Sequence, residues 1–385
     1  MRVLFLSTPL VSHAFPMIPL AWALRAAGDE VVFATTGPAL GVAAGGLDII
    51  DFDPDGECPS VAELNSRRPD LVTTRARQVA DGMPLLIEAT RQYLIKMIAV
   101  AESWRPDLIV HSQLQGGGPI AAARLGIPAV EHGTSLLRGG DFYEQLPELI
   151  DGAALAGRRA ALDVAPPSMI ETPSIGTGSA NGDSSARPAV SVWPMRYVPF
   201  NGSGLLPAEF TARTDRPRVA ITIGTSIMAP NMARLLPRTV ALARDMPAEF
   251  VLLLAGFADD VDLGSPVPPN LKIMRDWLPL RPLLAGCAAI MHHGGAGSTF
   301  AALDAGLPQL VVPSGAPNYL QSDAIARRGC GFVAEPDELD AALVARLLED
   351  ARVAAAAAQV QAEMAAMPSP ADVAARLAGL AGERP

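Results

Sequence analysis

The sequence has few cysteines and no long apolar run. Its three cysteines, Cys58, Cys287 and Cys330, are far apart and form no CxxC pair, which argues against a disulfide framework and a zinc site. No apolar run reaches the roughly 18 residues of a membrane span, and the N-terminus enters a strand pattern with no cleavable apolar leader. We therefore expect a soluble, cytoplasmic protein.

Basic runs and several well-known motifs are also missing. The 385 residues have a formal net charge of −10, which argues against nucleic acid or an anionic membrane as a partner. The sequence has no GxxxxGK[ST] P-loop, no GxGxxG after the first strand pattern, and no GxSxG elbow that would support a hydrolase triad. Nicotinamide chemistry and serine hydrolysis are therefore disfavoured.

Short apolar runs alternate with helical patterns in both halves of the chain, and 50% of the residues are hydrophobic. Strands are expected over 2–7, 30–35, 47–52, 107–111, 129–132, 190–198, 218–223, 249–255, 271–274, 287–291 and 309–312, with helices between them. This alternation predicts an α/β fold with two Rossmann-like, doubly wound domains facing each other across a cleft. The expected parts are a first domain (1–200), a linker (201–217), a second domain (218–367) and a C-terminal helix (368–385) that packs back on the first domain.

The most informative stretch runs from Ile290 to Thr299, where two histidines and three glycines join an apolar strand to a helix start. Glycines let the backbone approach a ligand, and the N-terminus of a helix favours an anion. The alternative is an ordinary strand-to-helix turn with two partly buried histidines. The histidine pair before the glycines and Ser-Thr after them favour an anion site.

Three further positions follow predicted strands, so their side chains can face the same cleft. His13, in a loop over 8–15, can act as a base near neutral pH, or it can cap the following helix. Thr225 and Ser226 form a second small loop that suits an anion, although a plain turn has the same pattern. Trp277 offers a flat face to a planar base, or it is a core residue.

Two pairs of acidic residues resemble a metal-binding DxD motif. One is Asp260 and Asp262, and the other is Asp51 and Asp53. No predicted helix or strand fixes the acidic loop over 259–262, so a solvated loop is favoured there, and the pair at 51 and 53 is interpreted in the same way. No metal site is expected.

With Asp276–Leu280 before it and Ala305–Gln309 after it, the segment His292–Ser298 resembles the GT-B nucleotide-sugar glycosyltransferases of bacterial antibiotic pathways. The segment Ser12–Pro16 fits the same family, and the resemblance covers nearly the whole chain. Members attach deoxysugars to polyketides, macrolides, enediynes and glycopeptides. The resemblance implies an acceptor-binding first domain, a donor-binding second domain, and an inverting, metal-independent reaction. It implies a dTDP-sugar or another NDP-sugar as co-substrate and no cofactor.

The resemblance also implies a role for each matching residue. Donor diphosphate binding falls to His293, Gly295, Ala296, Gly297 and Ser298, with Thr225 and Ser226 opposite. Trp277 and Leu278 would lie against the nucleobase, and His13 would deprotonate the acceptor. A hydrophobic, aromatic acceptor would be lined by Phe15, Met17, Met83, Leu136 and Phe142.

The sequence departs from the family pattern in two places. Many members have an aspartate that orients the catalytic histidine where this chain has Ser112, which makes Asp141 the candidate carboxylate. Many also have Asp-Gln near the sugar, where this chain has Asn318 and Gln321 as candidates. A deoxysugar would suit the loss of that carboxylate.

The sequence leaves several alternatives open. A deprotonated phenol is nucleophilic at oxygen and at ring carbons, so the product could be an O- or a C-glycoside. An inactive auxiliary partner of a glycosyltransferase and a nucleotide-sugar epimerase of the same fold are the alternative functions. The oligomeric state is also open, and a homodimer is one of the options.

Overall fold

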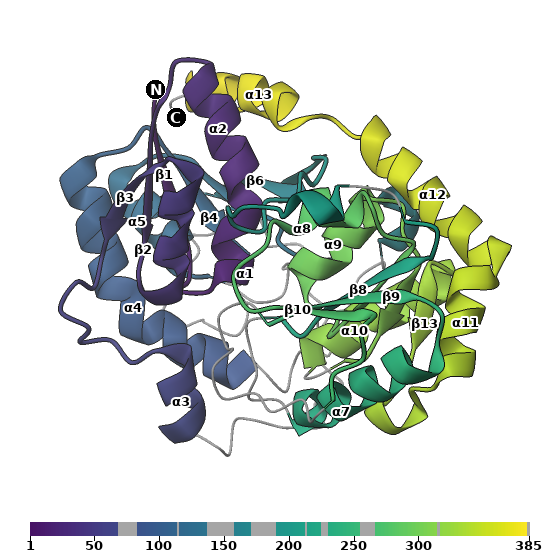
Figure 1. Ribbon diagram of the computed structural model, residues 1–385. Coiled ribbons are helices and arrows are strands. Elements are labelled where there is room, and N and C mark those ends of the chain that lie inside the picture. Colours follow the sequence, from purple (N-terminus) through teal and green to yellow (C-terminus); the bar gives the residue numbers. More distant parts are fainter. Residues whose placement is uncertain are drawn as a thin grey trace, which may run out of the picture.

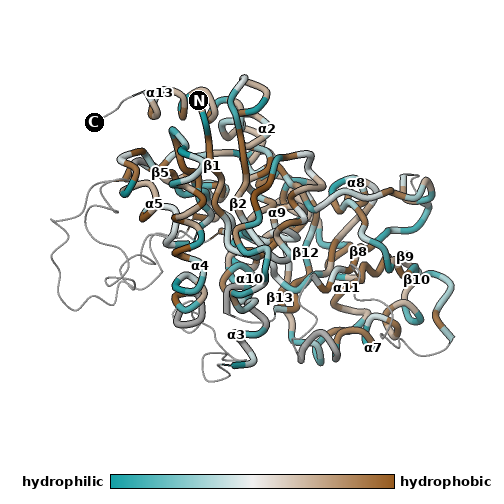
Figure 2. Tube along the Cα trace, turned by 90° about the vertical axis from the view of Figure 1, so that its left-hand side faces the viewer, coloured by the Kyte–Doolittle hydropathy of each residue, from teal (hydrophilic) through white to brown (hydrophobic). Residues whose placement is uncertain are grey.

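The structure is a computed structural model that describes residues 1–67, 83–113, 115–136, 158–170, 190–211, 214–224, 230–254, 266–313 and 316–382. Figure 1 shows two α/β domains side by side, each built on one parallel sheet. Figure 2 shows hydrophobic strands inside both domains. The predicted fold class, two doubly wound domains, is confirmed.

The N-terminal sheet has seven strands in the order β3-β2-β1-β4-β5-β6-β7. They are β1 (Arg2–Leu6), β2 (Glu30–Thr35), β3 (Asp48–Asp51), β4 (Leu108–Ser112), β5 (Ala129–His132), β6 (Arg158–Asp163) and β7 (Ser191–Pro194). Alternate residues of β1 enter different cores. Val3 and Phe5 pack with α2 (Ile18–Ala26), whereas Leu4 and Leu6 pack with α4 (Met83–Trp104) and α5 (Gly117–Leu125). Burial on both faces explains why β1 is a continuous apolar run from Val3 to Leu6.

The C-terminal sheet has six strands in the order β10-β9-β8-β11-β12-β13. They are β8 (Arg218–Thr222), β9 (Glu249–Leu253), β10 (Leu271–Met274), β11 (Ala289–His292), β12 (Gln309–Val311) and β13 (Gly331–Val333). Helices α7 (Pro230–Asp245) and α11 (Ala341–Glu349) cover one face, and α8 (Leu280–Leu284) and α9 (Ala296–Asp304) cover the other. The strand order reverses between β8 and β11, as it does between β1 and β4, and ligands of such sheets bind at these switch points.

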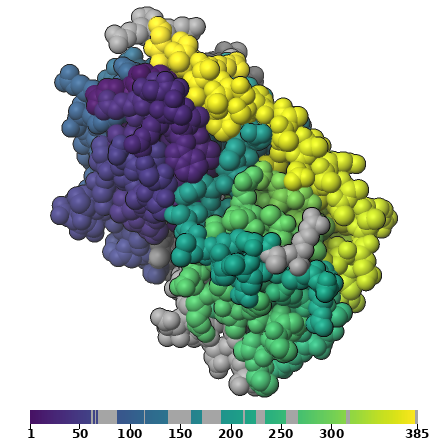
Figure 3. All heavy atoms as spheres, turned by 45° about the horizontal axis from the view of Figure 1, so that its top comes forward, coloured from purple at the N-terminus to yellow at the C-terminus, as the bar shows by residue number. Residues whose placement is uncertain are grey.

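The last helix, α13 (Pro370–Gly382), returns to the N-terminal domain. Val373 and Leu377 join the core that contains α2. Beside them, the Arg376 guanidinium lies 3.8 Å from the centroid of the Trp193 ring. Figure 3 shows this C-terminal segment in yellow, running from the C-terminal domain to the purple N-terminal region.

Several predicted elements differ from the structure. The loop expected over 8–15 contains the short helix α1 (Val11–Ala14), so His13 lies on a helix. Strands β6 and β13 were not expected, and α10 (Ala316–Arg328) begins earlier than predicted because its first turns carry few apolar residues.

The single helix expected over 339–367 is two helices, α11 and α12 (Ala351–Ala366). Asp350 separates them because its side chain accepts the Arg352 N–H at 3.0 Å and caps α12.

The acidic pair at 51–53 is not a solvated loop as expected. Asp53 is buried, forms an ion pair with Lys96, and accepts the backbone N–H groups of Glu57 and Cys58. The pair at 260–262 lies outside the described residues. Within the described ranges, no group of three or more His, Cys, Asp or Glu side chains is placed to hold a metal ion. None of the helices in those ranges is long and apolar enough to cross a membrane.

Acid should destabilise this fold because buried histidines stay neutral in the folded chain. His132 and His292 are fully buried, and burial lowers their pKa from 6.5 to about 4 and about 3, respectively. Below the unfolded pKa, the unfolded chain binds protons that the folded chain does not, so stability falls as the pH falls from 6.5 towards 4. Each of these histidines should cost about 2 kcal/mol of unfolding free energy between pH 7 and pH 5.

Urea unfolding at the two pH values measures this loss. His132→Asn is the matched variant, because His132 Nδ1 lies 2.7 Å from the Gly133 carbonyl and an asparagine amide can donate to the same oxygen. The variant should lose about 2 kcal/mol less than the natural chain between pH 7 and pH 5. Equal losses in the two proteins would contradict the assignment.

Candidate active site between the two domains

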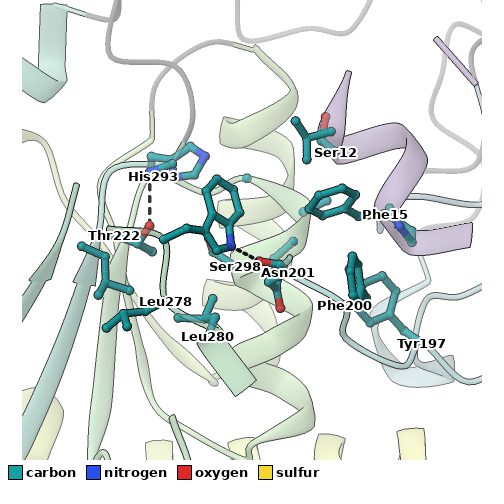
Figure 4. Close-up of a pocket in the computed structure, with 18 of the residues that line it drawn as sticks. Ser12, Phe15, Tyr197, Phe200, Asn201, Thr222, Leu278, Leu280, His293 and Ser298 are labelled. Carbon is teal, nitrogen blue, oxygen red and sulfur yellow. Dashed lines mark hydrogen bonds between the residues drawn. The ribbon is translucent and has the colours of Figure 1, made fainter. Parts of the chain in front are cut away.

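A cleft lies between the domains at the carboxyl ends of the central strands (Figure 4). Its lining residues include Ser12 and Phe15 from the N-terminal domain, Phe200 and Asn201 from the connection, and Thr222, Trp277, His293 and Gly295 from the C-terminal domain. In Figure 4, Ser12 and Phe15 face His293 and Thr222 across this space. The cleft therefore brings together segments that follow β1, β8, β10 and β11.

His293 follows β11 directly, and its ring fits between two glycines. A Cβ on Gly224 would lie 2.3 Å from the His293 Cε1, and a Cβ on Gly295 would lie 2.3 Å from its Nε2. The ring is hydrogen-bonded to the Thr222 backbone carbonyl (Figure 4), and burial lowers its pKa to about 4. Its Nδ1 is buried and has no hydrogen-bond partner among the described residues. Such an atom is a candidate contact for a polar ligand.

Helix α9 begins at the same place. Gly295 is its N-cap and has extended backbone angles, and no described side chain caps the helix. Ala296, Gly297 and Ser298 form the first turn and line the cleft. The first N–H groups of a helix have no partner within the helix, and the helix dipole adds positive potential there. This wall of the cleft is therefore suited to an anion.

Trp277 follows β10 and is held by the connection between the domains. Its indole N–H donates to the Asn201 carbonyl, and a Cβ on Gly202 would lie 2.3 Å from the indole nitrogen. The Phe15 ring lies edge-on to the Trp277 ring, with a centroid distance of 6.5 Å, and it also contacts Phe200, at 5.0 Å. Trp277 is half-buried and lines the cleft beside Leu278, so it offers a fixed aromatic surface.

His13 lies on α1 beside Ser12, which lines the opposite wall, but His13 itself is not among the lining residues of the cleft. Its Nδ1 is 3.1 Å from the Gln113 backbone carbonyl. A carbonyl only accepts, so Nδ1 carries the proton and Nε2 keeps its lone pair. Burial lowers the His13 pKa to about 4, although the hydrogen bond to Gln113 opposes the shift. The imidazole is therefore neutral at pH 7 and can accept a proton.

Ser112 occupies the position where the resemblance implies an aspartate. Its side chain is fully buried, and its Oγ accepts the Thr8 N–H at 3.5 Å. The next residue, Gln113, holds His13 through its backbone. The Gln113 side-chain oxygen in turn accepts the Thr134 N–H at 3.3 Å. Asp141, the other candidate carboxylate, lies outside the described residues.

The predicted sugar contacts lie behind the glycine turn. Gln321, on α10, is 2% exposed, and its Nε2 donates to the Gly294 carbonyl at 3.1 Å. The backbone oxygen of Asn318 would lie 2.9 Å from a Cβ on Gly294. Both residues pack against the turn, and contact with a sugar remains a prediction.

The remaining predicted residues divide into buried and undescribed positions. Met17 and Leu136 are buried in the core that contains α2, and neither is among the residues that line the cleft. Met83 begins α4, and its side chain lies outside the described part of the chain. Thr225, Ser226 and Phe142 also lie outside the described residues.

Sequence reasoning gave no site role to several residues that line the cleft, among them Thr222, Phe200 and Asn201. A polar residue at the end of an apolar strand, as at Thr222, was an available signal. Asn201 was assigned to the linker, yet its side-chain amide donates to the Gly297 carbonyl at 3.3 Å. Its side-chain oxygen is buried without a partner among the described residues.

Comparison with known proteins agrees with this geometry. Residues 22–224 and 238–380 match the N-terminal and C-terminal domains of the family described as erythromycin biosynthesis protein CIII-like. The elloramycin glycosyltransferase ElmGT of Streptomyces olivaceus is 39% identical over 396 residues, which cover 98% of this chain and 97% of that protein.

Solved structures give the same result. The glycosyltransferase SnogD from Streptomyces nogalater is 36% identical, with a TM-score of 0.78 over 99% of this chain and 100% of that one. The spinosyn rhamnosyltransferase SpnG, solved with thymidine diphosphate, is 29% identical, with a TM-score of 0.78 over 98% and 100% of the two chains. The chain therefore belongs to the erythromycin biosynthesis protein CIII-like family of GT-B glycosyltransferases of antibiotic pathways.

Proposed function

We propose that the protein transfers a deoxysugar from a dTDP-sugar to an aromatic, polyketide-type acceptor, with inversion at the anomeric carbon. One observation carries the proposal: the uncapped start of α9, His293 and Trp277 share a cleft with α1, which carries His13. This arrangement suits a reaction in which one domain holds the leaving group and the other activates the nucleophile.

The donor would lie against the C-terminal domain. Its diphosphate would meet the first N–H groups of α9 beside His293, whose Nδ1 would donate to a phosphate oxygen in the protonated ring that a neighbouring anion favours. Its base would meet Trp277 and Leu278. A dipole that already points at the diphosphate stabilises the charge that develops when the sugar leaves. The complex of SpnG with thymidine diphosphate supports dTDP as the nucleotide. The reaction as proposed uses the dTDP-sugar as its co-substrate and needs no further cofactor.

The acceptor would be deprotonated by His13 at Nε2. The partner of this histidine is a neutral backbone carbonyl, which stabilises a developing imidazolium less than a carboxylate does. A base of this kind suits an acidic hydroxyl, and a phenol with a pKa near 10 is one. The aromatic rings of Phe15 and Phe200 beside α1 fit a flat acceptor. A phenolate can then form an O- or a C-glycosidic bond.

An assay that crosses several dTDP-deoxysugars and UDP-glucose with phenolic and aliphatic acceptors tests this proposal. We expect transfer from dTDP-deoxysugars to phenols, also in the presence of a metal chelator. Mass spectrometry before and after acid treatment distinguishes the linkages, because a C-glycoside resists acid. The anomeric proton coupling reports inversion. A preference for UDP-glucose, or for aliphatic alcohols, would contradict the proposal, and a rearranged sugar formed without acceptor would indicate an epimerase.

A further inference from the structure

Buried side chains hold the Gly294 peptide groups on both sides. The Gly294 N–H donates to His292 Nδ1 at 3.1 Å, and the Gly294 carbonyl accepts from Gln321 Nε2 at 3.1 Å. The other ring nitrogen of His292 lies 2.8 Å from Gln309 Oε1. His292, Gln309 and Gln321 come from β11, β12 and α10, and each is at most 2% exposed. We call these three residues the Gly294 clamp.

The hydrogen bonds fix the chemical state of His292. A backbone N–H only donates, so Nδ1 must be the acceptor and Nε2 must carry the proton. Nε2 then donates to the side-chain oxygen of Gln309. Burial and the neighbouring His293 lower the pKa of His292 to about 3, which keeps the ring neutral. Both ring nitrogens are therefore used in holding the turn.

The clamped residue lies where the chain changes direction. Gly294 has a φ of 84°, and a Cβ there would lie 2.9 Å from the Asn318 carbonyl and 3.1 Å from Ser322 Oγ. His293 precedes it, and the N-cap of α9 follows it. The orientation of the Gly294 peptide groups therefore sets both the position of His293 and the direction of the first N–H groups of α9.

We propose that His292 is a positioning residue for the donor, which acts through the Gly294 clamp without touching the ligand. By holding the Gly294 peptide groups, it makes His293 and the start of α9 converge on one diphosphate. Pre-organised donors bind an anion without having to be ordered first, so loosening them weakens binding. This inference rests on the donor site proposed above and adds the buried residues that support it.

Two substitutions each remove one of the two hydrogen bonds of the His292 side chain and keep the other. The side-chain oxygen of asparagine reaches the position of Nδ1, so His292→Asn keeps the acceptor for Gly294 and loses the donor to Gln309. The longer His292→Gln places its amide near the position of Nε2 and leaves the Gly294 N–H without its acceptor. Titration with dTDP should give a Kd within about threefold of the natural value for His292→Asn and at least tenfold weaker for His292→Gln.

Thermal unfolding of each variant distinguishes positioning from general damage. We expect similar melting temperatures for the two His292 variants, different dTDP affinities, and a donor KM that rises in His292→Gln while the acceptor KM stays unchanged. Gln321→Met removes the other hydrogen bond of the clamp and should also weaken dTDP binding about tenfold. The inference is overturned if both His292 variants bind dTDP equally well, or if affinity falls only in proportion to lost folded protein.

The same titration tests the proposed dTDP donor and the role of the Gly294 clamp separately. The natural chain is titrated with dTDP, UDP and GDP before the variants are compared on the nucleotide that binds tightest. A preference for UDP or GDP contradicts the dTDP donor, and the clamp is still judged from the two His292 variants on that nucleotide. Absence of binding to all three nucleotides contradicts both.

Discussion

His13→Ala should lower kcat by about 10²–10⁴-fold and leave the Kd for dTDP unchanged. The expected loss is large because His13 is the proposed base, and the hydrogen bond from its Nδ1 to the Gln113 carbonyl leaves Nε2 available. Donor affinity should be preserved because the residues proposed to bind the diphosphate lie in the C-terminal domain, away from α1. Steady-state kinetics with a phenolic acceptor, together with titration of dTDP, measures both quantities.

The pH dependence provides a second test of His13. Its pKa is lowered to about 4, so the base is already neutral at pH 6 and kcat/KM should not rise between pH 6 and pH 8 on its account. A histidine paired with a carboxylate would instead have a raised pKa and would lose activity below pH 7. If His13→Ala kept full kcat, His13 would not be the base, and Asp141→Ala in the same series would test the other candidate.

Gly295→Ala should weaken dTDP binding by about 100-fold or more, which is about 2.7 kcal/mol. The backbone angles of Gly295 suit any residue, with φ −65° and ψ 142°, so the effect comes from the added methyl group. That carbon would lie 2.3 Å from His293 Nε2. The His293 ring would have to move, and its alignment with the start of α9 would be lost. Isothermal titration with dTDP measures the effect.

Two other glycines serve as controls for Gly295→Ala. Gly297→Ala adds a methyl group two residues after Gly295, in the first turn of α9. The nearest atom to that methyl group is Asn201 Nδ2, at 3.2 Å, so dTDP binding should weaken only severalfold. Gly379→Ala places a methyl group in open space on α13. It should leave dTDP binding unchanged and stabilise the chain by about 0.5–1 kcal/mol. Tight dTDP binding by Gly295→Ala would show that His293 has no role in donor affinity.

The central parts of the fold could be predicted because they depend on local sequence. Strands such as β1 and β8 are buried on both faces and therefore appear as continuous apolar runs. Strand β13 could not be predicted, because its three residues are too few to form a recognisable strand pattern. The break between α11 and α12 could not be predicted either. It depends on the Asp350 side chain capping α12, whereas the surrounding alanine-rich sequence has strong helical propensity throughout.

The candidate site could be predicted in part, for a similar reason. The glycine turn and the start of α9 are adjacent in sequence, so their pattern reveals them. The partner of His13 could not be found, because a backbone carbonyl carries no residue-specific signal and any residue at position 113 would supply one. Gln321 has the residue type expected for a sugar contact, but only the packing of α10 against the turn shows that its amide donates to Gly294.

The return of α13 to α2 means that the N-terminal domain is not a continuous piece of the chain. The core of the N-terminal domain includes Val373 and Leu377, so it is complete only after the end of the chain has been synthesised. The chain also crosses between the domains twice, and the second crossing limits how far they can separate. A hybrid enzyme that takes its acceptor half from one relative and its donor half from another therefore needs two junctions, one near 201–217 and one near 368, so that α13 stays with the half it packs against.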